Sequence, residues 1–541
     1  MKKLVSVLLT LLMLLSLFSF ANAEEQTEFT VLSGISALSS GYDDNPVLNS
    51  MMEKAGIKIT WDTWSDSLNE VVGTRISGNA SSRTPIDAFQ AVGFSNYDLM
   101  RYGDAGTFID LTPYITPETM PNLSAILESH PEIRAAITMD GKIYGLPAGE
   151  QMTTLGIGRE KSYSIFCVPE FSMINKAWLD DLGLAMPTTL DELHDVLAAF
   201  KENDMSAKFY GNEAGSTIPM STGFDQWCWG QNIFYAGFGF TNFFMDSPLT
   251  QDLTVNREGK VNFISDDDNY RAALTYFHNW YAEGLMDMEM FSQDTNQLIA
   301  KCSGGRVGVA TWWEINEIMG PHAADYVYLP VLKGPDGTCN VTLRTGGQVN
   351  AGQLSVTAQC KNPAKLLSFY DQWYQGENVM QLQYGPIGVF FNEKNDAGLW
   401  KSITDEESRA KFNKSAGELK AQSEVAGPKL ILAEYYNEVF EMEPRAQERL
   451  ADLYDFWMSY VEDDTRYPLD VVFTRSELDD IDYYKPDLEK AQSEYEANWI
   501  KNGGPTDDEW KAYKDFLERC GLSTLEQIYQ DAYDRYMAAM Q

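Results

Sequence analysis

Apolar residues near the start of the chain follow two spacings, which predict alternating strands and helices. Apolar runs or period-two alternation predict strands over 29–35, 57–61 and 85–92. Helical spacing predicts helices over 45–55 and 65–76, the first opened by an Asn-Pro pair and ended by a glycine. This β-α-β-α-β order predicts a parallel, doubly wound sheet, whose ligands lie beyond the carboxyl ends of the strands.

Five later helices are predicted from capping residues that precede apolar side chains at helical spacing. Their predicted starts are Thr189, Ser265, Asn362, Thr506 and Ser523. We find neither an internal repeat nor a long low-complexity linker. The parts of the chain are therefore expected to be joined by short crossings rather than by flexible tethers.

Residues 1–23 have the pattern of a secretory signal peptide. Two lysines precede the apolar stretch 4–20, and Ala21-Asn22-Ala23 forms a small-x-small cleavage site. We expect cleavage after Ala23 and export of the remaining chain to the periplasm or the medium. Because the first cysteine is Cys167, we expect no lipid anchor at the new N-terminus.

The composition of the 541 residues is globular, with 44% hydrophobic and 22% charged residues. The formal net charge of −38 argues against a nucleic-acid partner and against binding to anionic membranes. Aromatic residues make up 13%, including 13 Trp and 28 Tyr, so either a large aromatic core or an aromatic binding surface is expected.

The cysteines and histidines indicate neither a metal site nor a fixed disulfide framework. Six cysteines in an exported chain permit up to three bridges, but a chain this long does not need them, and free buried thiols are the simpler interpretation. There are four histidines and no Cys-x-x-Cys, so a zinc site built on Cys/His spacing is excluded. The sequence also lacks a Gly-x-Ser-x-Gly elbow, a His-Glu-x-x-His motif and a phosphate loop.

Several ordered stretches resemble one protein family. They are Asp140-Gly141-Lys142-Ile143-Tyr144-Gly145-Leu146-Pro147, the stretch from Asn175 to Leu193, Tyr281-Ala282-Glu283-Gly284-Leu285-Met286-Asp287, Gly305 to Trp313, and the tail from Trp499 to Tyr536. Together they resemble the extracellular solute-binding proteins of ABC importers, in particular the large carbohydrate-binding group related to maltose-binding protein. Each stretch alone is a weak signal, whereas the ordered set is specific.

The resemblance implies an α/β, two-lobed fold of the periplasmic-binding-protein type. Each lobe would be a doubly wound sheet with flanking helices, with a ligand cleft between the lobes and extra C-terminal helices. By analogy we expect lobe one at 24–148 and 327–357, and lobe two at 149–326 and 358–541. The implied function is capture of a carbohydrate, expected to be an oligosaccharide, by a monomer that closes on its hinge and delivers the sugar to membrane permease subunits.

One region departs from the family pattern. Many large relatives carry a calcium loop after the helix equivalent to 189–201. The chain has Glu202-Asn203-Asp204-Met205-Ser206-Ala207-Lys208 there, without the regularly spaced oxygen ligands that a hard cation needs. We therefore expect no calcium in this loop, and no other cofactor or metal is predicted.

Tryptophans supply the strongest candidates for sugar contact, because a sugar ring presents an apolar face edged with hydroxyls. Trp312, Trp313 and Glu314 follow an apolar strand in a loop that points into the cleft in the family. Adjacent residues on extended chain face opposite ways, so one Trp is expected to pack inside and the other to face ligand. Trp227 and Trp229 share a face if extended, and form either a sugar platform or part of the core.

Three further aromatic residues stand where cleft residues belong. Tyr42 follows the first predicted strand and Trp64 the second, and the alternatives are a solvated loop for Tyr42 and packing at a helix start for Trp64. Tyr384, in Gln383-Tyr384-Gly385-Pro386, resembles a loop that edges the cleft in the family, and its alternative is packing beneath that loop.

Three polar residues complete the candidate ligand-binding set. Glu150 and Gln151 follow the first crossing between lobes, where they are either ligand contacts or solvated loop residues. Arg344 follows the second crossing and would pair with an acidic sugar or, as the charge balance favours, with one of the chain's many carboxylates.

Two other function classes stay open at this point. A secreted glycoside hydrolase or lyase also combines aromatic residues with carboxylates, but in a chain with 79 acidic residues some carboxylate pairs lie at glycosidase distances by chance. The same fold could also bind a peptide or another small solute. Turnover of a glycoside separates the first alternative from a binding protein, and a ligand screen separates the second.

Overall fold

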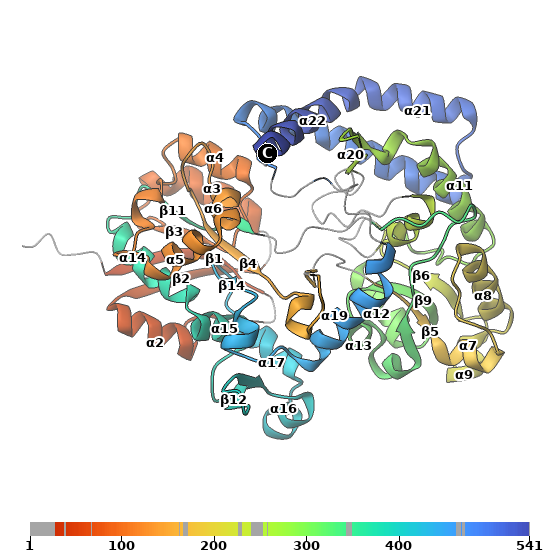
Figure 1. The fold of residues 1–541 in the computed structure, drawn as a ribbon, viewed down its shortest axis with the longest axis horizontal. Helices are drawn as coiled ribbons and strands as arrows, with labels where there is room; N and C mark the ends of the chain where they lie inside the picture. Colours follow the sequence, from red (N-terminus) through yellow and green to blue (C-terminus); the bar gives the residue numbers. More distant parts are fainter. Residues whose placement is uncertain are drawn as a thin grey trace, which may run out of the picture. The chain divides into compact units, whose positions relative to one another are not determined.

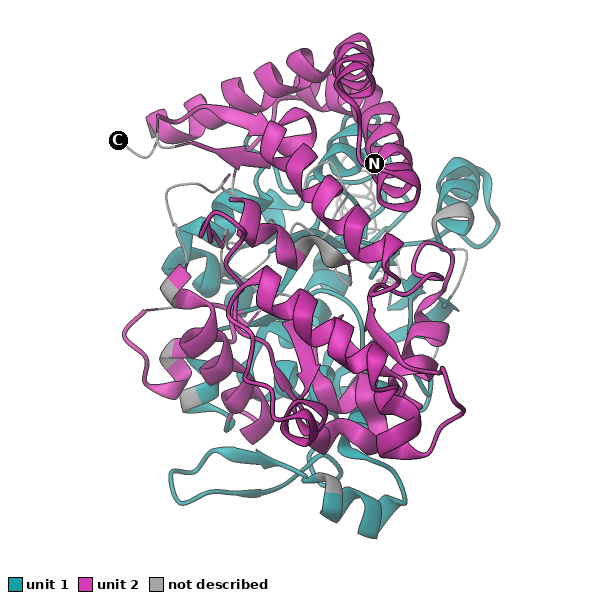
Figure 2. Cartoon of the chain, turned by 90° about the vertical axis from the view of Figure 1, so that its right-hand side faces the viewer, with its two compact units in different colours: residues 1–150, 349–441 teal, residues 151–348, 442–541 magenta. Residues whose placement is uncertain are grey.

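The computed structural model describes residues 27–36, 39–65, 68–161, 163–165, 171–224, 230–239, 253–256, 258–341, 349–460, 467 and 471–539. The predicted signal peptide lies outside them. The chain forms two compact units, unit 1 of residues 1–150 and 349–441, and unit 2 of residues 151–348 and 442–541 (Figure 2).

Unit 1 is built on a six-stranded sheet with the order β14-β4-β11-β3-β1-β2. Its strands are β1 (Glu28–Gly34), β2 (Lys58–Trp64), β3 (Ala88–Gln90), β4 (Leu146–Glu150), β11 (Asn350–Val356) and β14 (Leu430–Ile431), and a separate hairpin is formed by β12 (Phe391–Lys394) and β13 (Trp400–Ser402). β1 runs parallel to β2 and β3, as the sequence predicts. β11 runs antiparallel to both β3 and β4, so the sheet is mixed.

The helices of unit 1 flank this sheet, except α16, which lies beside the β12–β13 hairpin (Figure 1). They are α2 (Pro46–Ala55), α3 (Leu68–Gly78), α4 (Asn96–Asp104), α5 (Pro121–Ser129), α6 (Pro131–Ile137), α14 (Pro363–Asp371), α15 (Gly376–Tyr384), α16 (Asp405–Phe412), α17 (Ala416–Ser423) and α18 (Tyr435–Glu438). The predicted start and end of α2 are confirmed. The Asn45 side chain accepts hydrogen bonds from two free amides of the first turn, and Gly56 ends the helix at a φ of 62°.

Unit 2 is built on a four-stranded sheet with the order β10-β5-β9-β6. Its strands are β5 (Phe171–Asn175), β6 (Ile218–Ser221), β9 (Val307–Trp312) and β10 (Tyr326–Tyr328), and a separate hairpin is formed by β7 (Leu253–Val255) and β8 (Val261–Phe263). β9 is buried along its whole length and runs parallel to β6 and antiparallel to β5. The two residues after β9 therefore start from a rigid, central strand.

The helices of unit 2 include a C-terminal group. They are α7 (Lys176–Leu182), α8 (Leu190–Glu202), α9 (Met205–Tyr210), α11 (Asp268–Ala282), α12 (Thr295–Ser303), α13 (Ile315–Met319), α19 (Pro444–Phe456), α20 (Arg475–Asn502), α21 (Asp507–Arg519) and α22 (Leu522–Ala539), with the 3₁₀ helix η5 (Gln231–Phe238). α20 packs against α11 and α22 (Figure 1). α22 begins before the predicted Ser523, and its Glu526 carboxylate accepts the amide of Phe263 instead of capping the helix.

Two of the predicted lobe boundaries differ from the boundaries of the two compact units. Residues 358–441, predicted in lobe two, belong to unit 1, because α14 packs on α2 and α5 and because β14 extends the unit 1 sheet beside β4. Residues 327–348, predicted in lobe one, belong to unit 2, where β10 pairs with β5. The predicted first crossing at residue 148 lies two residues from the unit boundary at 150.

Aromatic side chains fill much of the core of both units. Trp178, Trp280, Trp373 and Trp457 are fully buried. Of the six cysteines, Cys302, Cys339, Cys360 and Cys520 are free thiols, and Cys167 and Cys228 lie outside the described residues. Among the described residues, no helix is both long and apolar enough to cross a membrane.

Candidate functional site

At the carboxyl end of β4 in unit 1, the carboxylate of Glu150 meets two tyrosine hydroxyls. The phenol hydroxyls of Tyr384 and Tyr436 both donate to Oε1 of Glu150, over 2.8 and 2.5 Å. Burial, followed by the Glu150 charge, raises the pKa of Tyr436 well above its ordinary value. No donor from the described part of the chain reaches Oε2 of Glu150, so this half-buried carboxylate keeps an acceptor for a ligand hydroxyl.

Two lysines lie close to Glu150 and Tyr384. Lys420 Nζ lies 4.6 Å from the centre of the Tyr384 ring. Lys429 is buried and donates to the carbonyl of Val425 over 2.8 Å, and burial lowers the pKa of its ammonium group. The Tyr384 ring is thus held between a cation and the Glu150 carboxylate, with the ring itself only 4% exposed.

Tyr42 lies in the core of unit 1 rather than in a solvated loop. Its side chain is 2% exposed and meets Trp61 edge-on, with ring centres 5.2 Å apart. Its hydroxyl donates to the Gly34 carbonyl over 3.3 Å and accepts the Ala426 amide over 3.1 Å. Burial raises the pKa of Tyr42 to about 12, so the hydroxyl stays neutral and positions the segment that leads to β14.

Trp64 ends β2 and is half-buried. Its Nε1 donates to Oδ1 of Asp62 over 2.8 Å, and the same carboxylate pairs with Arg75. The indole is therefore fixed by its own strand. Whether it contacts a ligand stays a prediction.

The end of β9 carries two tryptophans that face different surroundings. Trp312 is 5% exposed and donates through Nε1 to Oε2 of Glu317 over 3.1 Å. Trp313 is half-buried, and the guanidinium of Arg449 lies 5.3 Å from its ring centre. The same guanidinium lies 5.3 Å from the ring centre of Phe171. As predicted for adjacent residues, one indole is inside, and the other retains exposed surface.

Glu314 is held by an arginine that the sequence interpretation missed. Arg445 donates through Nε and Nη2 to both oxygens of Glu314 over 2.8–3.0 Å, although the glutamate is only 6% exposed. Arg445 also donates to the hydroxyl of Tyr328, and burial, followed by the Glu314 charge, raises the pKa of that tyrosine to about 12. Arg445 and Arg449 stand four residues apart on α19, which was the available signal that they share a helix face.

The ligand contacts of all the candidate residues stay predictions, and three of these residues are not described. Trp227, Trp229 and Arg344 lie outside the described residues. Gln151 is half-buried and directly follows Glu150. The structure thus brings Glu150 together with Tyr384 in unit 1, and places Trp312, Trp313 and Glu314 on one edge of unit 2.

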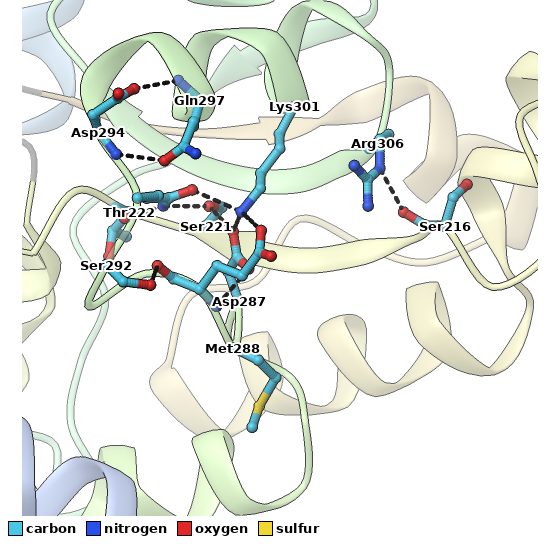
Figure 3. Close-up of polar contacts among 12 residues, drawn as sticks. Ser216, Ser221, Thr222, Asp287, Met288, Ser292, Asp294, Gln297, Lys301 and Arg306 are labelled. Carbon is cyan, nitrogen blue, oxygen red and sulfur yellow. Dashed lines mark hydrogen bonds and ion pairs between the residues drawn. The ribbon is translucent and has the colours of Figure 1, made fainter.

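An ionic network around the buried Lys301 and Asp287 joins several segments of unit 2 (Figure 3). Lys301 Nζ, on α12, lies 2.7 Å from Asp287 Oδ2 and 2.7 Å from Glu289 Oε2, and donates to Gln293 Oε1 over 2.8 Å. Ser221 donates to the same Asp287 oxygen over 2.7 Å. Every polar group named here has a partner, so the network satisfies itself inside the protein.

This network joins the end of β6 to the segment 287–293. Gln293 donates to the hydroxyl of Ser221 over 3.1 Å and to the carbonyl of Thr222 over 2.8 Å. The chain continues from Thr222 toward Trp227 and Trp229, which are not described. The network therefore fixes the base from which the segment with those tryptophans departs.

In the loop 202–208, where no calcium is expected, the Asp204 carboxylate accepts hydrogen bonds from the segment that leads to β6. Asp204, at a φ of 44°, accepts the amide of Gly215 over 2.6 Å and the hydroxyl of Thr217 over 2.7 Å. These hydrogen bonds lower the pKa of the Asp204 carboxyl. In the described part of the chain, no group of three or more His, Cys, Asp or Glu side chains could hold a metal ion. The absence of calcium stays a prediction.

Comparisons with known proteins agree on one family. The family model of the bacterial extracellular solute-binding proteins matches residues 45–376. The chain is 32% identical over 493 residues to the fructooligosaccharide ABC transporter substrate-binding protein FusA of Streptococcus pneumoniae serotype 4. The aligned region covers 91% of this chain and 87% of that protein.

Solved structures give the same result. The structure of S. pneumoniae FusA in complex with kestose matches with a TM-score of 0.83 and 30% identity, over 95% of this chain and 100% of that one. An HMO binding, ABC-transporter associated solute-binding protein from Bifidobacterium longum infantis matches with a TM-score of 0.77 over 94% of this chain and 99% of that one. At 20% identity, the second match supports the fold alone.

Proposed function

Because the chain belongs to the bacterial extracellular solute-binding protein family, we propose that it captures a neutral oligosaccharide and delivers it to the permease of an ABC importer. The observation that carries this proposal is the similarity to the fructooligosaccharide-binding FusA, which extends over 91% of the chain. A fructooligosaccharide is therefore the first candidate substrate. The formal charge of −38 favours a neutral over an acidic glycan.

Trp313 is proposed as the aromatic platform for a sugar ring. The Arg449 guanidinium lies over the ring and makes its position rigid, and the ring retains exposed surface because it is half-buried. A sugar ring would stack on the face opposite the guanidinium, with its apolar C–H groups against the indole. Trp312 and Glu314 would act beneath it, since both are nearly fully buried and bound to Glu317 and Arg445.

Glu150 is proposed as the hydroxyl acceptor contributed by unit 1. Its Oε1 is occupied by two phenols, which fix the rotamer of the carboxylate. Its Oε2 would accept a sugar hydroxyl, and the Tyr384 and Tyr436 hydroxyls would hold the carboxylate in place while it does so.

The proposed mechanism is hinge closure of a monomer, with no bond broken. Ligand contacts on both units would stabilise the closed form, which would then dock on the permease. Export by the predicted signal peptide is part of this proposal. A glycosidase is the alternative that the test must separate.

The test is a calorimetric titration of the mature chain, residues 24–541, with kestose and longer fructooligosaccharides, followed by mass analysis of the recovered glycan. A specific binder at a ligand concentration of 100 Kd gains about 2.7 kcal/mol of stability, which a thermal shift also detects. Trp313→Ala should weaken binding by about tenfold or more, equivalent to ~1.4 kcal/mol.

Trp400→Ala is the matched control. Trp400 also carries a cation over its ring, with Lys394 Nζ 4.7 Å from the ring centre, but it lies on the β12–β13 hairpin. Its replacement should leave the affinity unchanged. Recovery of a shortened glycan would favour the enzyme, and the lack of binding by any neutral oligosaccharide would overturn the proposal.

A further inference from the structure

Cationic and aromatic side chains alternate beside the end of β9 in unit 2. The guanidinium carbon of Arg449 lies 5.3 Å from the ring centre of Trp313 and 5.3 Å from that of Phe171. Phe171 meets Tyr328 with ring centres 4.6 Å apart and ring planes inclined by 34°. The guanidinium carbon of Arg445 lies 5.9 Å from the centre of the Tyr328 ring. The contacts therefore run from Trp313 through Arg449, Phe171 and Tyr328 to Arg445, and we call this set the cation–aromatic series.

The cation–aromatic series returns to its start through Glu314, which directly follows Trp313 in the chain. Arg445 donates to both carboxylate oxygens of Glu314 and, over 3.1 Å, to the hydroxyl of Tyr328. Burial, followed by the Glu314 charge, raises the pKa of Tyr328 to about 12, against the opposing charges of Arg445 and Arg449. The two residues that follow β9 are thus each contacted by a different arginine of α19.

The members of the cation–aromatic series come from separate segments of unit 2. Phe171 begins β5 and Tyr328 ends β10, two strands that pair in the sheet, whereas Arg445 and Arg449 lie one turn apart on α19. Phe171, Tyr328 and Arg449 are all buried. Because a cation that is withdrawn from water is held more strongly by aromatic rings than an exposed one, the Arg449 guanidinium restricts the orientation of the Trp313 indole.

We propose that Arg449 is a positioning residue for sugar binding, which holds the Trp313 indole in its binding orientation before the ligand arrives. This role rests on the proposed function of Trp313, and adds that the platform is already formed in the ligand-free protein. A side chain that is ordered beforehand loses less conformational freedom on binding, so the affinity depends on Arg449 through Trp313. Arginine suits this role because its planar guanidinium stacks on aromatic rings, whereas the ammonium of lysine is a compact point charge.

The test is fluorine NMR of the mature chain labelled with fluorotryptophan, combined with calorimetric titration of kestose. Trp313→Phe identifies the Trp313 signal. Arg449→Met should move or broaden that signal in the ligand-free protein and leave in place the signals of Trp178 and Trp373, which pack against other aromatic residues. Arg449→Met should also weaken kestose binding by about three- to tenfold, the range expected for ordering one side chain.

Arg449→Lys keeps the buried charge, so this variant is expected to fold even if Arg449→Met does not. It should show the same changes at a smaller size, with part of the kestose affinity recovered. A residue that only stabilises the fold would change the free energy of unfolding without changing the Trp313 signal or the affinity of the folded protein. A wild-type Trp313 signal and wild-type affinity in every Arg449 variant that folds would overturn the positioning role.

Lys394→Met is the matched control, because Lys394 Nζ lies 4.7 Å from the ring centre of Trp400 on the β12–β13 hairpin. It should move the Trp400 signal and leave both the Trp313 signal and the kestose affinity unchanged. A moved Trp313 signal with unchanged affinity in the Arg449 variants would also overturn the positioning role, while wild-type binding and the proposed function stand. If the wild type bound no neutral oligosaccharide, the proposed function itself would be overturned, and the positioning role with it.

Discussion

Asp287 and Asp266 are two carboxylates of unit 2 that are withdrawn from solvent, but their surroundings differ. Asp287 is 6% exposed and its Oδ2 is shared by Lys301 and Ser221, each over 2.7 Å. Asp266 is half-buried, and no described side chain donates to its oxygens. One carboxylate is buried with a cation in contact, while the other is half-buried and forms no ion pair with a described residue.

The difference separates a buried, ion-paired carboxylate from a half-buried carboxylate without a cation in direct contact among the described residues. Breaking a satisfied network removes a partner from a buried charge, which destabilises the folded state. Replacing a half-buried carboxylate that lacks a cation partner should instead relieve part of the cost of its burial. Glu314 lies between these cases, since it is buried but is held by an arginine that remains partly exposed.

The largest effect is expected from Lys301→Met. The variant leaves Asp287 buried without its cation, which should lower the free energy of unfolding by about 3–5 kcal/mol. Lys176→Met is the matched control, because Lys176 pairs with Asp180 at the surface, where side-chain exposures are 42% and 62%. Its effect should stay below about 1 kcal/mol. Denaturant unfolding of both variants measures the difference, and equal effects would refute the distinction.

The next effect is expected from Arg445→Met. Glu314 would keep the Asn316 amide as a donor but lose its bidentate partner, which should cost about 1–2 kcal/mol because Arg445 itself is 37% exposed. Arg75→Met, which breaks the more exposed pair with Asp62, is the control and should cost less than about 1 kcal/mol. A larger loss in the control than in Arg445→Met would contradict the ranking by burial.

Local signals in the sequence identified many elements. The family resemblance is confirmed by the match over residues 45–376, and the two-lobed fold by the solved relatives. The capping box at Thr506 is confirmed, with Glu509 accepting the Thr506 amide and Thr506 accepting the Glu509 amide. The residues that form a capping box lie within a few positions of one another, so the sequence alone is enough to predict it.

Long-range contacts could not be predicted in the same way. Tyr42 was expected to contact ligand or to be solvated, but its side chain is 2% exposed and its hydroxyl accepts the amide of Ala426, 384 positions away. The spacing of Arg445 and Arg449 shows that both share a face of α19, but not that Arg445 meets Glu314, 131 positions away. The antiparallel direction of β11 and the membership of residues 358–441 in unit 1 also depend on contacts between segments that are far apart in the sequence.

The smallest effect is expected from Asp266→Asn and Asp268→Asn. These two variants should change the free energy of unfolding at pH 7 in opposite directions. Burial raises the pKa of Asp266, against the attraction of Lys514 and with the repulsion of Asp267 and Glu518. The contribution of the Asp266 carboxyl to stability is therefore fully present below its pKa in the unfolded state, about 3.9. It is lost as the pH rises through its higher pKa in the folded state. Asp266→Asn should raise the free energy of unfolding at pH 7, and the gain should shrink toward pH 4.

Asp268, two residues away and exposed, should behave in the opposite way. A hydrogen bond from Trp510 and the charge of Lys514 lower its pKa, so its contribution is present above the unfolded pKa and lost as the pH falls through the folded pKa. Asp268→Asn should therefore be less stable than the wild type at pH 7, with a loss that shrinks as the pH falls. Urea unfolding between pH 4 and 7 measures both differences. If both variants shift stability with the same sign, burial does not distinguish the two carboxylates.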